Sequence, residues 1–241
     1  MPAKPPAQTP LTAPVADIFV SVQGEGVYCG QKQLFIRFAG CNLRCSYCDE
    51  PAARSGTKAK RLTVRQLLRA ADMLLQNNPA GNVSLTGGEP LLYPDFLNKL
   101  IPALKRRGLR VHLETNGTLP RAYEKLRRKP DVVAADIKLR SATGRELWVE
   151  HEQFLRLCHE RAFVKTVLHS KASREEILKT INIIATTDPT IPLIWQPATR
   201  STSGSVKSAP AALLKWALAK AAKRLQTVKV LPQMHVLWGL K

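Results

Sequence analysis

The sequence contains no run of about 18 apolar residues, the length that a membrane-spanning helix needs. We therefore expect no membrane span and no membrane partner. The first ten residues are rich in proline and lack an apolar core, so they do not match a secretory signal peptide. Their composition predicts a flexible leader over residues 1–16, followed by a single domain over residues 17–241. Together these absences predict a cytoplasmic protein.

Acidic residues are scarce, with 18 Asp and Glu against 37 Lys and Arg, which gives a formal net charge of +19. Such an excess could attract nucleic acid, an anionic membrane or an acidic protein. The basic residues are spread along the chain, and no basic run alternates with aromatic residues, so we do not expect direct nucleic-acid binding. The plain interpretation is a solvated basic surface. The alternative is a docking surface for an acidic electron donor.

Cysteine is also infrequent, but three of the five cysteines, Cys41, Cys45 and Cys48, lie within one short stretch. Three thiols this close cannot all pair, which argues for a reducing compartment rather than a disulfide framework. Closely spaced thiolates are the usual ligands of Zn²⁺ or of an iron–sulfur cluster. A closed zinc site would need a distant fourth ligand, such as Cys29 or Cys158. A cluster would instead leave one iron open to a ligand that is not protein.

Short apolar runs and helical patterns alternate about six times along the chain. Strands are expected over residues 18–22, 33–38, 83–86, 109–114, 132–137, 163–168, 192–196 and 227–231. Helices are expected after the N-cap Thr63 and over residues 94–107, 119–128, 147–159, 173–185 and 209–224, whereas residues 50–61 look polar and irregular. This order predicts an α/β fold with a mostly parallel sheet and right-handed crossovers.

Polar side chains gather where the predicted strands end. They are Thr86, Glu89, Glu114, Asn116, Asp136, Lys138, Lys165 and Gln196. Because the carboxyl ends of parallel strands share one edge of the sheet, these residues predict a site at that edge. Two alternatives stay open: Glu114 and Asn116 could only cap strand ends, and Lys165 could be an internal ion-pair partner.

Two motifs carry a resemblance to a known superfamily. Cys41-x-x-x-Cys45-x-x-Cys48, with Tyr47 before the third cysteine, is followed one β/α unit later by Gly87-Gly88-Glu89-Pro90. This pair resembles the signature of the radical S-adenosylmethionine (radical SAM) superfamily and implies its partial (β/α)6 barrel. A narrower resemblance, to the 7-carboxy-7-deazaguanine synthase family, is carried by residues 21–26, 35–43, 114–118, 196–197 and 233–235. It extends from about residue 17 to the C-terminus.

The superfamily resemblance implies the cofactors. Cys41, Cys45 and Cys48 would hold a [4Fe–4S] cluster whose open iron binds the methionine moiety of S-adenosylmethionine. A low-potential donor, flavodoxin or ferredoxin, would supply the electron that releases a 5′-deoxyadenosyl radical. The side chain of Glu89 would receive the methionine ammonium. The implied S-adenosylmethionine contacts are Ser46, Tyr47, Cys48, Gly87, Gly88, Glu89, Asp136, Ile137, Lys138 and Gln196.

The narrower resemblance implies a lyase of queuosine and archaeosine precursor synthesis. It would convert 6-carboxy-5,6,7,8-tetrahydropterin, after hydrogen abstraction at C6, into 7-carboxy-7-deazaguanine and ammonia. Arg37, a charge inside an apolar strand, would pair with the substrate carboxylate in a bidentate manner, or else with a local acid. A homodimer is the family expectation. The implied substrate contacts are Val22, Gln23, Gly24, Arg37, Thr86, Glu114, Asn116 and His235.

The sequence departs from the family pattern at two places. Where the family has Asp-Thr after the third cysteine, with the threonine near a Mg²⁺ ion, this chain has Asp49-Glu50. Glu50 would bind Mg²⁺ more strongly than a hydroxyl does, but without metal its charge would repel the substrate carboxylate. The second departure is the tail, where His235-Val236 replaces His-Lys, so a role for a terminal carboxylate is in doubt.

Other functions remain as alternatives. A glycyl-radical-enzyme activating protein would use the same cluster but dock a large protein partner, and such activases lack the Gln23-Gly24-Glu25-Gly26 stretch and the Arg37 strand. Another radical SAM enzyme acting on a related small substrate is a second alternative. A nucleic-acid-binding zinc protein is a third and more distant one.

Overall fold

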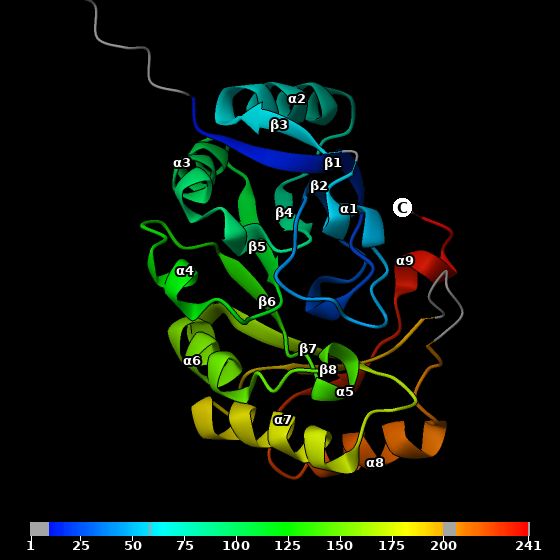
Figure 1. The fold of residues 1–241 in the computed structure, drawn as a ribbon. Helices are drawn as coiled ribbons and strands as arrows, with labels where there is room; N and C mark the ends of the chain where they lie inside the picture. Colours follow the sequence, from blue (N-terminus) through cyan, green and yellow to red (C-terminus); the bar gives the residue numbers. More distant parts are fainter. Residues whose placement is uncertain (1–9, 58, 200–205, 241) are drawn as a thin grey trace, which may run out of the picture.

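A computed structural model describes residues 10–57, 59–199 and 206–240 of the chain. Within them a nine-stranded sheet has the order β3-β1-β2-β4-β5-β6-β7-β8-β9, so the outermost strands do not pair with each other. The sheet curls without closing (Figure 1). The strands are β1 (Thr12–Val22), β2 (Lys32–Phe38), β3 (Lys60–Thr63), β4 (Asn82–Gly87), β5 (Arg110–Thr115), β6 (Val132–Asp136), β7 (Ala162–Leu168), β8 (Leu193–Pro197) and β9 (Val228–Val230).

Most neighbouring strands are parallel, as the alternation of strands and helices predicts. β2 and β4 to β9 form one parallel series, whereas β1 runs antiparallel to both β2 and β3. The α/β fold with a partial, mostly parallel barrel is therefore confirmed. Strands β1 and β3, which pair with each other in antiparallel orientation, extend the sheet at one edge.

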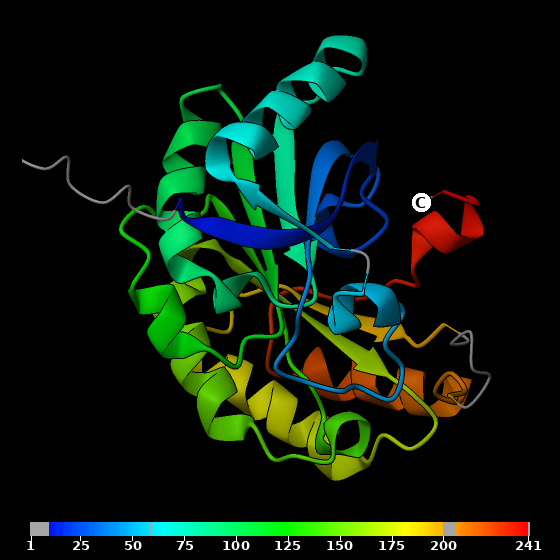
Figure 2. The same ribbon diagram turned by 45° about the horizontal axis from the view of Figure 1, so that its top comes forward.

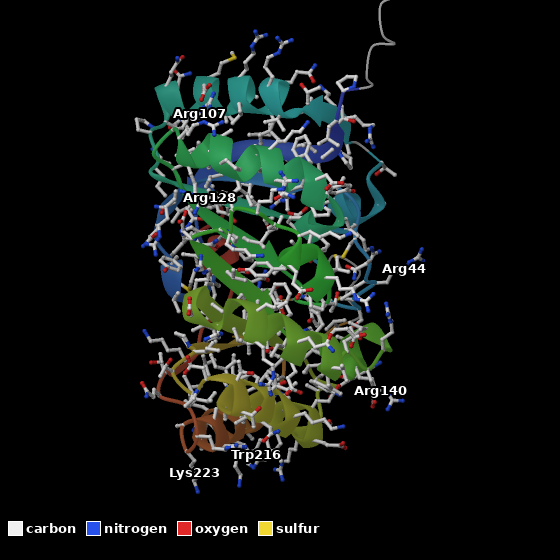
Figure 3. The ribbon with its side chains drawn as sticks, turned by 90° about the vertical axis from the view of Figure 1, so that its left-hand side faces the viewer. Arg44, Arg107, Arg128, Arg140, Trp216 and Lys223 are labelled. Carbon is white, nitrogen blue, oxygen red and sulfur yellow. The ribbon has the colours of Figure 1, made fainter. Side chains whose placement is uncertain are left out.

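Helices form the outer layer of the barrel, and the open side carries α1 and α9 (Figure 1). Figure 3 shows the charged side chains standing on this outer layer. Two helices begin with a capping box: the one at Ser173 was expected, and at Thr63 only an N-cap was expected. The helices are α1 (Pro51–Ser55), α2 (Val64–Asn77), α3 (Pro94–Lys105), α4 (Pro120–Glu124), α5 (Arg140–Thr143), α6 (Trp148–Cys158), α7 (Arg174–Thr187), α8 (Ala211–Ala221) and α9 (Met234–Leu237), with 3-10 turns at Gly26–Tyr28, Pro90–Leu92 and His159–Arg161.

The alternation of side chains along each strand separates the core from the site. On β2, Leu34, Ile36 and Phe38 belong to the hydrophobic core, while Phe35 and Arg37 line a cavity on the other face. The same two-residue period recurs on the other parallel strands. Of the polar residues expected at strand ends, all except Glu89 line this cavity.

The predicted leader is wrong at residues 12–16, because β1 begins at Thr12. Ala13 and Val15 are 0% and 4% exposed and belong to the core, and this part of β1 pairs with β3. Residues 1–9 of the predicted leader lie outside the described residues. The region 50–61 is also not irregular throughout, since it holds α1 and the start of β3. In the described part of the chain, no helix combines the length and the apolar character needed to cross a bilayer.

Candidate active site

A cavity of about 430 Å³ lies against the inner face of the sheet. The loop that carries the three cysteines, residues 41–48, forms one wall and is called the cysteine loop here. The inner faces of the parallel strands and the segment around His235 form the others. The predicted site residues on its wall are Val22, Gln23, Gly24, Arg37, Cys41, Cys45, Tyr47, Cys48, Glu50, Thr86, Gly87, Gly88, Glu114, Asn116, Asp136, Lys138, Gln196 and His235.

The cysteine loop follows β2 directly and is tied to its surroundings by hydrogen bonds. The Ser46 amide donates to the Ala142 carbonyl of α5 at 2.9 Å. The Cys41 thiol lies 3.9 Å from Asn116 Nδ2. Burial raises the pKa of the Cys41 and Cys45 thiols. Such thiols become thiolates when a metal binds them, so the loop suits a metal centre better than a free nucleophile.

The two remaining cysteines do not complete a zinc site. Cys29 and Cys158 are absent from the cavity wall, and Cys158 donates its thiol to the Phe154 carbonyl within α6. Burial raises the pKa of Cys158 to about 12. Among the described residues, no three His, Cys, Asp or Glu side chains are grouped to enclose a single metal ion. Three thiols facing one cavity fit a larger cluster that keeps one position open.

The glycine pair at the end of β4 is required by a close approach of two backbones. Gly87 has φ +118, and a Cβ there would lie 2.1 Å from the Phe38 carbonyl oxygen. A Cβ on Gly88 would lie 1.9 Å from the Gly40 carbonyl oxygen. The Gly88 amide donates to Phe38 at 3.0 Å, and the amide of Glu89 donates to Gly40 at 2.8 Å. The pair therefore fixes the start of the cysteine loop and presents bare backbone to the cavity.

The Glu89 side chain lies behind the cavity wall. It is fully buried and does not line the cavity. Its carboxylate accepts hydrogen bonds from the Leu91 amide at 3.0 Å, the Thr115 hydroxyl at 2.9 Å and the Asn116 amide at 2.8 Å. Burial raises the pKa of Glu89 to about 7, while these hydrogen bonds act in the opposite direction. The carboxylate thus joins the glycine motif to the loop after β5, and its contact with a methionine ammonium stays a prediction.

Charged residues from β6 and β7 form the wall beside the cysteine loop. Lys138 Nζ lies 2.8 Å from Asp136 Oδ2 and 5.2 Å from the centre of the Tyr47 ring. Asp136 Oδ2 also lies 3.4 Å from Lys165 Nζ. Three buried atoms here, Asp136 Oδ1, the Tyr47 hydroxyl and Gln196 Oε1, have no partner within the described structure. Buried polar atoms of this kind are normally satisfied, so they mark places where a bound polar molecule fits.

Two further predicted contacts lie off the cavity. The Ile137 side chain is 2% exposed within the core, and its amide donates to the Lys165 carbonyl at 3.0 Å. Ser46 is exposed and absent from the cavity wall. These positions follow a cavity residue directly in the chain. Their side chains point elsewhere, which leaves only their backbone near the site.

Glu114 is the hydrogen-bonding centre of the wall formed by β4 and β5. It accepts from Gln23 Nε2 at 2.8 Å, from Ser84 Oγ at 2.6 Å and from Thr86 Oγ1 at 2.9 Å. Capping of the strand end does not account for this arrangement. The carboxylate fixes two other predicted substrate contacts, Gln23 and Thr86, in one orientation.

Glu25 is a site residue that the sequence reasoning missed. Its carboxylate pairs with Lys165 and accepts from Gln196 Nε2 at 3.0 Å and Gln233 Nε2 at 2.6 Å. Burial alone would raise the pKa of Glu25, but Lys165, the Gln233 amide and the charge of His235 lower it to about 2. Lys165 is thus both an ion-pair partner and a cavity residue. The signal was present in the sequence, because Glu25 stands inside the recognised motif at residues 23–26.

The C-terminal segment lies over the loop after β1 (Figure 2). The Met234 amide donates to the Gly24 carbonyl at 2.9 Å. A Cβ on Gly24 would lie 2.4 Å from His235 Nδ1, so only glycine fits beneath this histidine. This contact brings residues from opposite ends of the chain to one cavity.

Arg37 and Glu50, from β2 and from the residue before α1, form an ion pair at the cavity wall. Arg37 Nη1 lies 2.7 Å from Glu50 Oε1. The guanidinium carbon also lies 5.1 Å from the centre of the Phe19 ring. The local acid considered as an alternative partner for Arg37 is therefore present, and it is the residue that departs from the family pattern.

Comparison with known proteins places these features in a family. The sequence model of the Radical SAM superfamily matches residues 35–186. The 7-carboxy-7-deazaguanine synthase of Geobacter sulfurreducens is 38% identical over 251 residues, covering 94% of this chain and 97% of that protein. The protein of the same name from Methanothermobacter thermautotrophicus is 43% identical over 129 residues, covering 54% of this chain and 51% of its own.

Solved structures show the same fold. QueE from Escherichia coli superposes with a TM-score of 0.65 at 21% identity, covering 93% of this chain and 95% of its own. A radical SAM methyltransferase from Sphaerobacter thermophilus superposes with a TM-score of 0.62 at 14% identity, covering 84% of this chain and 66% of its own. The family match extends over most of the cavity wall. The chain therefore belongs to the radical SAM superfamily and, within it, to the 7-carboxy-7-deazaguanine synthase family.

Proposed function

We propose that this protein is a radical SAM lyase that converts 6-carboxy-5,6,7,8-tetrahydropterin into 7-carboxy-7-deazaguanine with release of ammonia. The reaction belongs to the synthesis of 7-deazapurine precursors, such as that of queuosine. One observation carries the proposal: a single cavity is lined by the three thiols of the cysteine loop, by the Gly87-Gly88 backbone and by Arg37. The full-length similarity to a 7-carboxy-7-deazaguanine synthase supports the same reaction.

The cysteine loop fits a [4Fe–4S] cluster, and the neighbouring wall fits S-adenosylmethionine. The glycine pair offers bare backbone, while Asp136, Tyr47 and Gln196 offer buried polar atoms that lack partners in the described structure. When bound, the two groups supply the reductive bond cleavage that starts radical chemistry. The protein residues bind and orient them and keep water out.

The opposite wall would bind and orient the pterin. Arg37 would pair with the substrate carboxylate, and Gln23, held by Glu114 at 2.8 Å, would meet the edge of the pterin ring. Lys165 stays protonated, because Glu25 and Asp136 raise its pKa against the effect of burial. It therefore serves as a fixed positive charge and hydrogen-bond donor at the cavity wall rather than as a base.

Glu50 is the residue we propose for Mg²⁺. Protein sites for this ion commonly use one or two carboxylates together with oxygen atoms of the substrate. Glu50 lies on the cavity wall beside Arg37, which supports a position shared with the substrate carboxylate. The ion would neutralise two carboxylates that otherwise repel each other. Loss of Mg²⁺ stimulation after Glu50→Gln is the expected outcome, and unchanged stimulation would exclude the role.

We also propose an acidic electron donor, such as a flavodoxin or ferredoxin, as a partner. Arg44 is exposed within the cysteine loop, and Arg140 begins the nearby helix α5. Both side chains project from the same side of the molecule in Figure 3. Arg44→Glu should slow reduction by flavodoxin far more than reduction by dithionite, since a small reductant does not need to dock on this surface. Equal slowing with both reductants would contradict this surface.

A homodimer and a cytoplasmic location complete the proposal. The segment after Gln233 exposes Val236, Leu237, Trp238 and Leu240, which is an apolar group that a second copy could cover. The five free cysteines and an iron–sulfur centre suit a reducing compartment. Sedimentation of the purified protein as a monomer at micromolar concentration would exclude the dimer.

The cavity volume favours this function over a glycyl-radical-enzyme activating protein. About 430 Å³ suits a small molecule, whereas an activating protein must admit a segment of its partner. The deciding experiment supplies anaerobically reconstituted protein with dithionite, S-adenosylmethionine and 6-carboxytetrahydropterin. We expect 7-carboxy-7-deazaguanine and ammonia. Formation of 5′-deoxyadenosine with intact pterin would keep the superfamily assignment and refute the substrate.

A further inference from the structure

His151 is a buried histidine that does not line the cavity but contacts two loops of the site. It stands on the first turn of α6, in the outer layer of the barrel (Figure 1), and is 2% exposed. The amide of Lys138, in the loop after β6, donates to His151 Nε2 at 3.0 Å. On the other side of the ring, a Cβ on Gly117, in the loop after β5, would lie 3.3 Å from His151 Nδ1. One side chain therefore joins the loops that follow two neighbouring parallel strands.

These contacts fix the protonation of the ring. Burial lowers the pKa of His151 to about 4, while hydrogen bonding with the Gly117 backbone acts in the opposite direction, so the ring is neutral at neutral pH. A backbone amide can only donate, so Nε2 accepts from Lys138 and carries no proton. The proton of the neutral ring therefore lies on Nδ1, which faces Gly117. Each ring nitrogen has a task of its own, and substitution can remove one task at a time.

The hydrogen bond to the Lys138 amide holds the turn that directs two charged side chains into the cavity. Lys138 Nζ lies 2.8 Å from Asp136 Oδ2 and stands over the Tyr47 ring. Asp136 Oδ1 and the Tyr47 hydroxyl are the buried atoms at this wall that lack partners within the described residues and that fit a bound polar molecule. The direction of both charged side chains depends on the backbone between them, which His151 holds at Lys138.

The contact with Gly117 supports the cysteine loop. The residues on either side of this glycine, Asn116 and Thr118, each form a side-chain hydrogen bond of 2.8 Å with Asn42 of the cysteine loop. Gly117 itself has φ +64, a left-handed conformation that glycine adopts without strain. His151 thus supports the cysteine loop through Nδ1 and the wall after β6 through Nε2.

We propose that His151 is a positioning residue for S-adenosylmethionine, whose Nε2 holds the Lys138 amide so that Asp136 and Lys138 face the bound cofactor. It touches neither the cofactor nor the reacting atoms. The inference rests on the proposed function for the place of the cofactor, but it does not depend on the identity of the pterin. It gives a role at the site to a histidine that belongs to none of the sequence motifs.

Two substitutions separate the tasks of the two ring nitrogens. His151→Gln places an amide oxygen near the position of Nε2, so it keeps an acceptor for the Lys138 amide and loses the donor toward Gly117. His151→Asn places an amide nitrogen near the position of Nδ1, so it keeps the donor and leaves the Lys138 amide unpaired. Urea unfolding of the metal-free proteins establishes first that both variants fold. The same replacement at His159, whose ring contacts the Arg156 carbonyl at the end of α6, is the control.

Equilibrium dialysis of S-adenosylmethionine against the anaerobically reconstituted proteins tests the proposal. His151→Asn should weaken binding about 10-fold, the effect of one buried amide left unpaired, whereas His151→Gln should weaken it by no more than about 2-fold. His159→Asn should leave the affinity unchanged. Equal weakening in the two His151 variants, which a purely structural residue would produce, would overturn the positioning role.

Hydrogen exchange in the metal-free protein provides a readout without cofactor. The Lys138 amide should be protected in the wild-type protein, and His151→Asn should speed its exchange about 10-fold while His151→Gln leaves it slow. Rapid exchange of this amide in the wild-type protein would overturn the proposal even if a variant failed to fold. If the wild-type protein binds S-adenosylmethionine but leaves the pterin intact, the proposed substrate fails, and the comparison of the two variants still decides the role of His151.

Discussion

Replacing Gly88 with alanine should destabilise the protein even when no cofactor is bound. The added Cβ would lie 1.9 Å from the Gly40 carbonyl oxygen and 2.6 Å from its carbon, both of which are backbone atoms that cannot rotate away. The end of β4 would have to move away from the cysteine loop. The substitution thus separates a structural role of the motif from its role in binding S-adenosylmethionine.

The expected loss follows from the contacts at this position. Forcing an extra methyl group into a packed site costs about 1–3 kcal/mol. The movement also weakens the hydrogen bonds from the Gly88 amide to Phe38 and from the Glu89 amide to Gly40, each worth about 1 kcal/mol. The free energy of unfolding should fall by about 3–5 kcal/mol, which lowers the melting temperature by roughly 10 °C for a chain of this size.

Urea and thermal unfolding of the metal-free protein measure this loss. Gly81→Ala is the matched control, because a Cβ there meets nothing within 4 Å, and we expect no loss or a gain of up to about 1 kcal/mol. If metal-free Gly88→Ala is as stable as the wild-type protein but no longer retains S-adenosylmethionine, the packing explanation is refuted. The glycine would then serve the cofactor alone.

Three further predictions concern titratable side chains. Lys165→Met should lower the free energy of unfolding by about 3–5 kcal/mol in urea, because Glu25 and Asp136 lose their shared cation; a neutral result would contradict the network. Burial lowers the pKa of His151 from 6.5 to about 4. Between these pH values the unfolded chain binds a proton that the folded protein does not, so the free energy of unfolding should fall by up to about 3 kcal/mol as the pH drops from 6.5 to 4. His151→Gln should make this pH dependence of the free energy of unfolding shallower. Glu50→Thr should retain turnover with an altered Mg²⁺ dependence, and identical Mg²⁺ titrations would refute a ligand role.

The parallel part of the fold could be predicted because its strands are buried on one face by helices and read as apolar runs. The start of β1 and the whole of β3 escaped this reasoning. Thr12 lies at the start of β1 and Arg61 on the edge strand β3, and their side chains are joined by a hydrogen bond of 3.0 Å. Pro14 interrupts the short apolar stretch at the start of β1, and β3 contains one apolar residue, Leu62, so neither stretch shows a clear hydrophobic period.

The site could be predicted as a set of residues but not as a set of contacts. Motif spacing brought the cysteine loop and the glycine pair together, yet it could not show that the Glu89 carboxylate turns away from the cavity toward backbone amides. It also could not pair Arg37 with Glu50, since the two lie on separate elements. Side-chain direction depends on packing between strands, which one sequence does not display.

The most direct test of the account follows the hydrogen at C6 of the substrate. Reconstituted protein is supplied with reductant, S-adenosylmethionine and 6-carboxytetrahydropterin that carries deuterium at C6, and the products are measured by mass spectrometry. The account predicts deuterium in 5′-deoxyadenosine together with equal amounts of 7-carboxy-7-deazaguanine and ammonia. Unlabelled 5′-deoxyadenosine, with the deuterium still in the pterin, would contradict it.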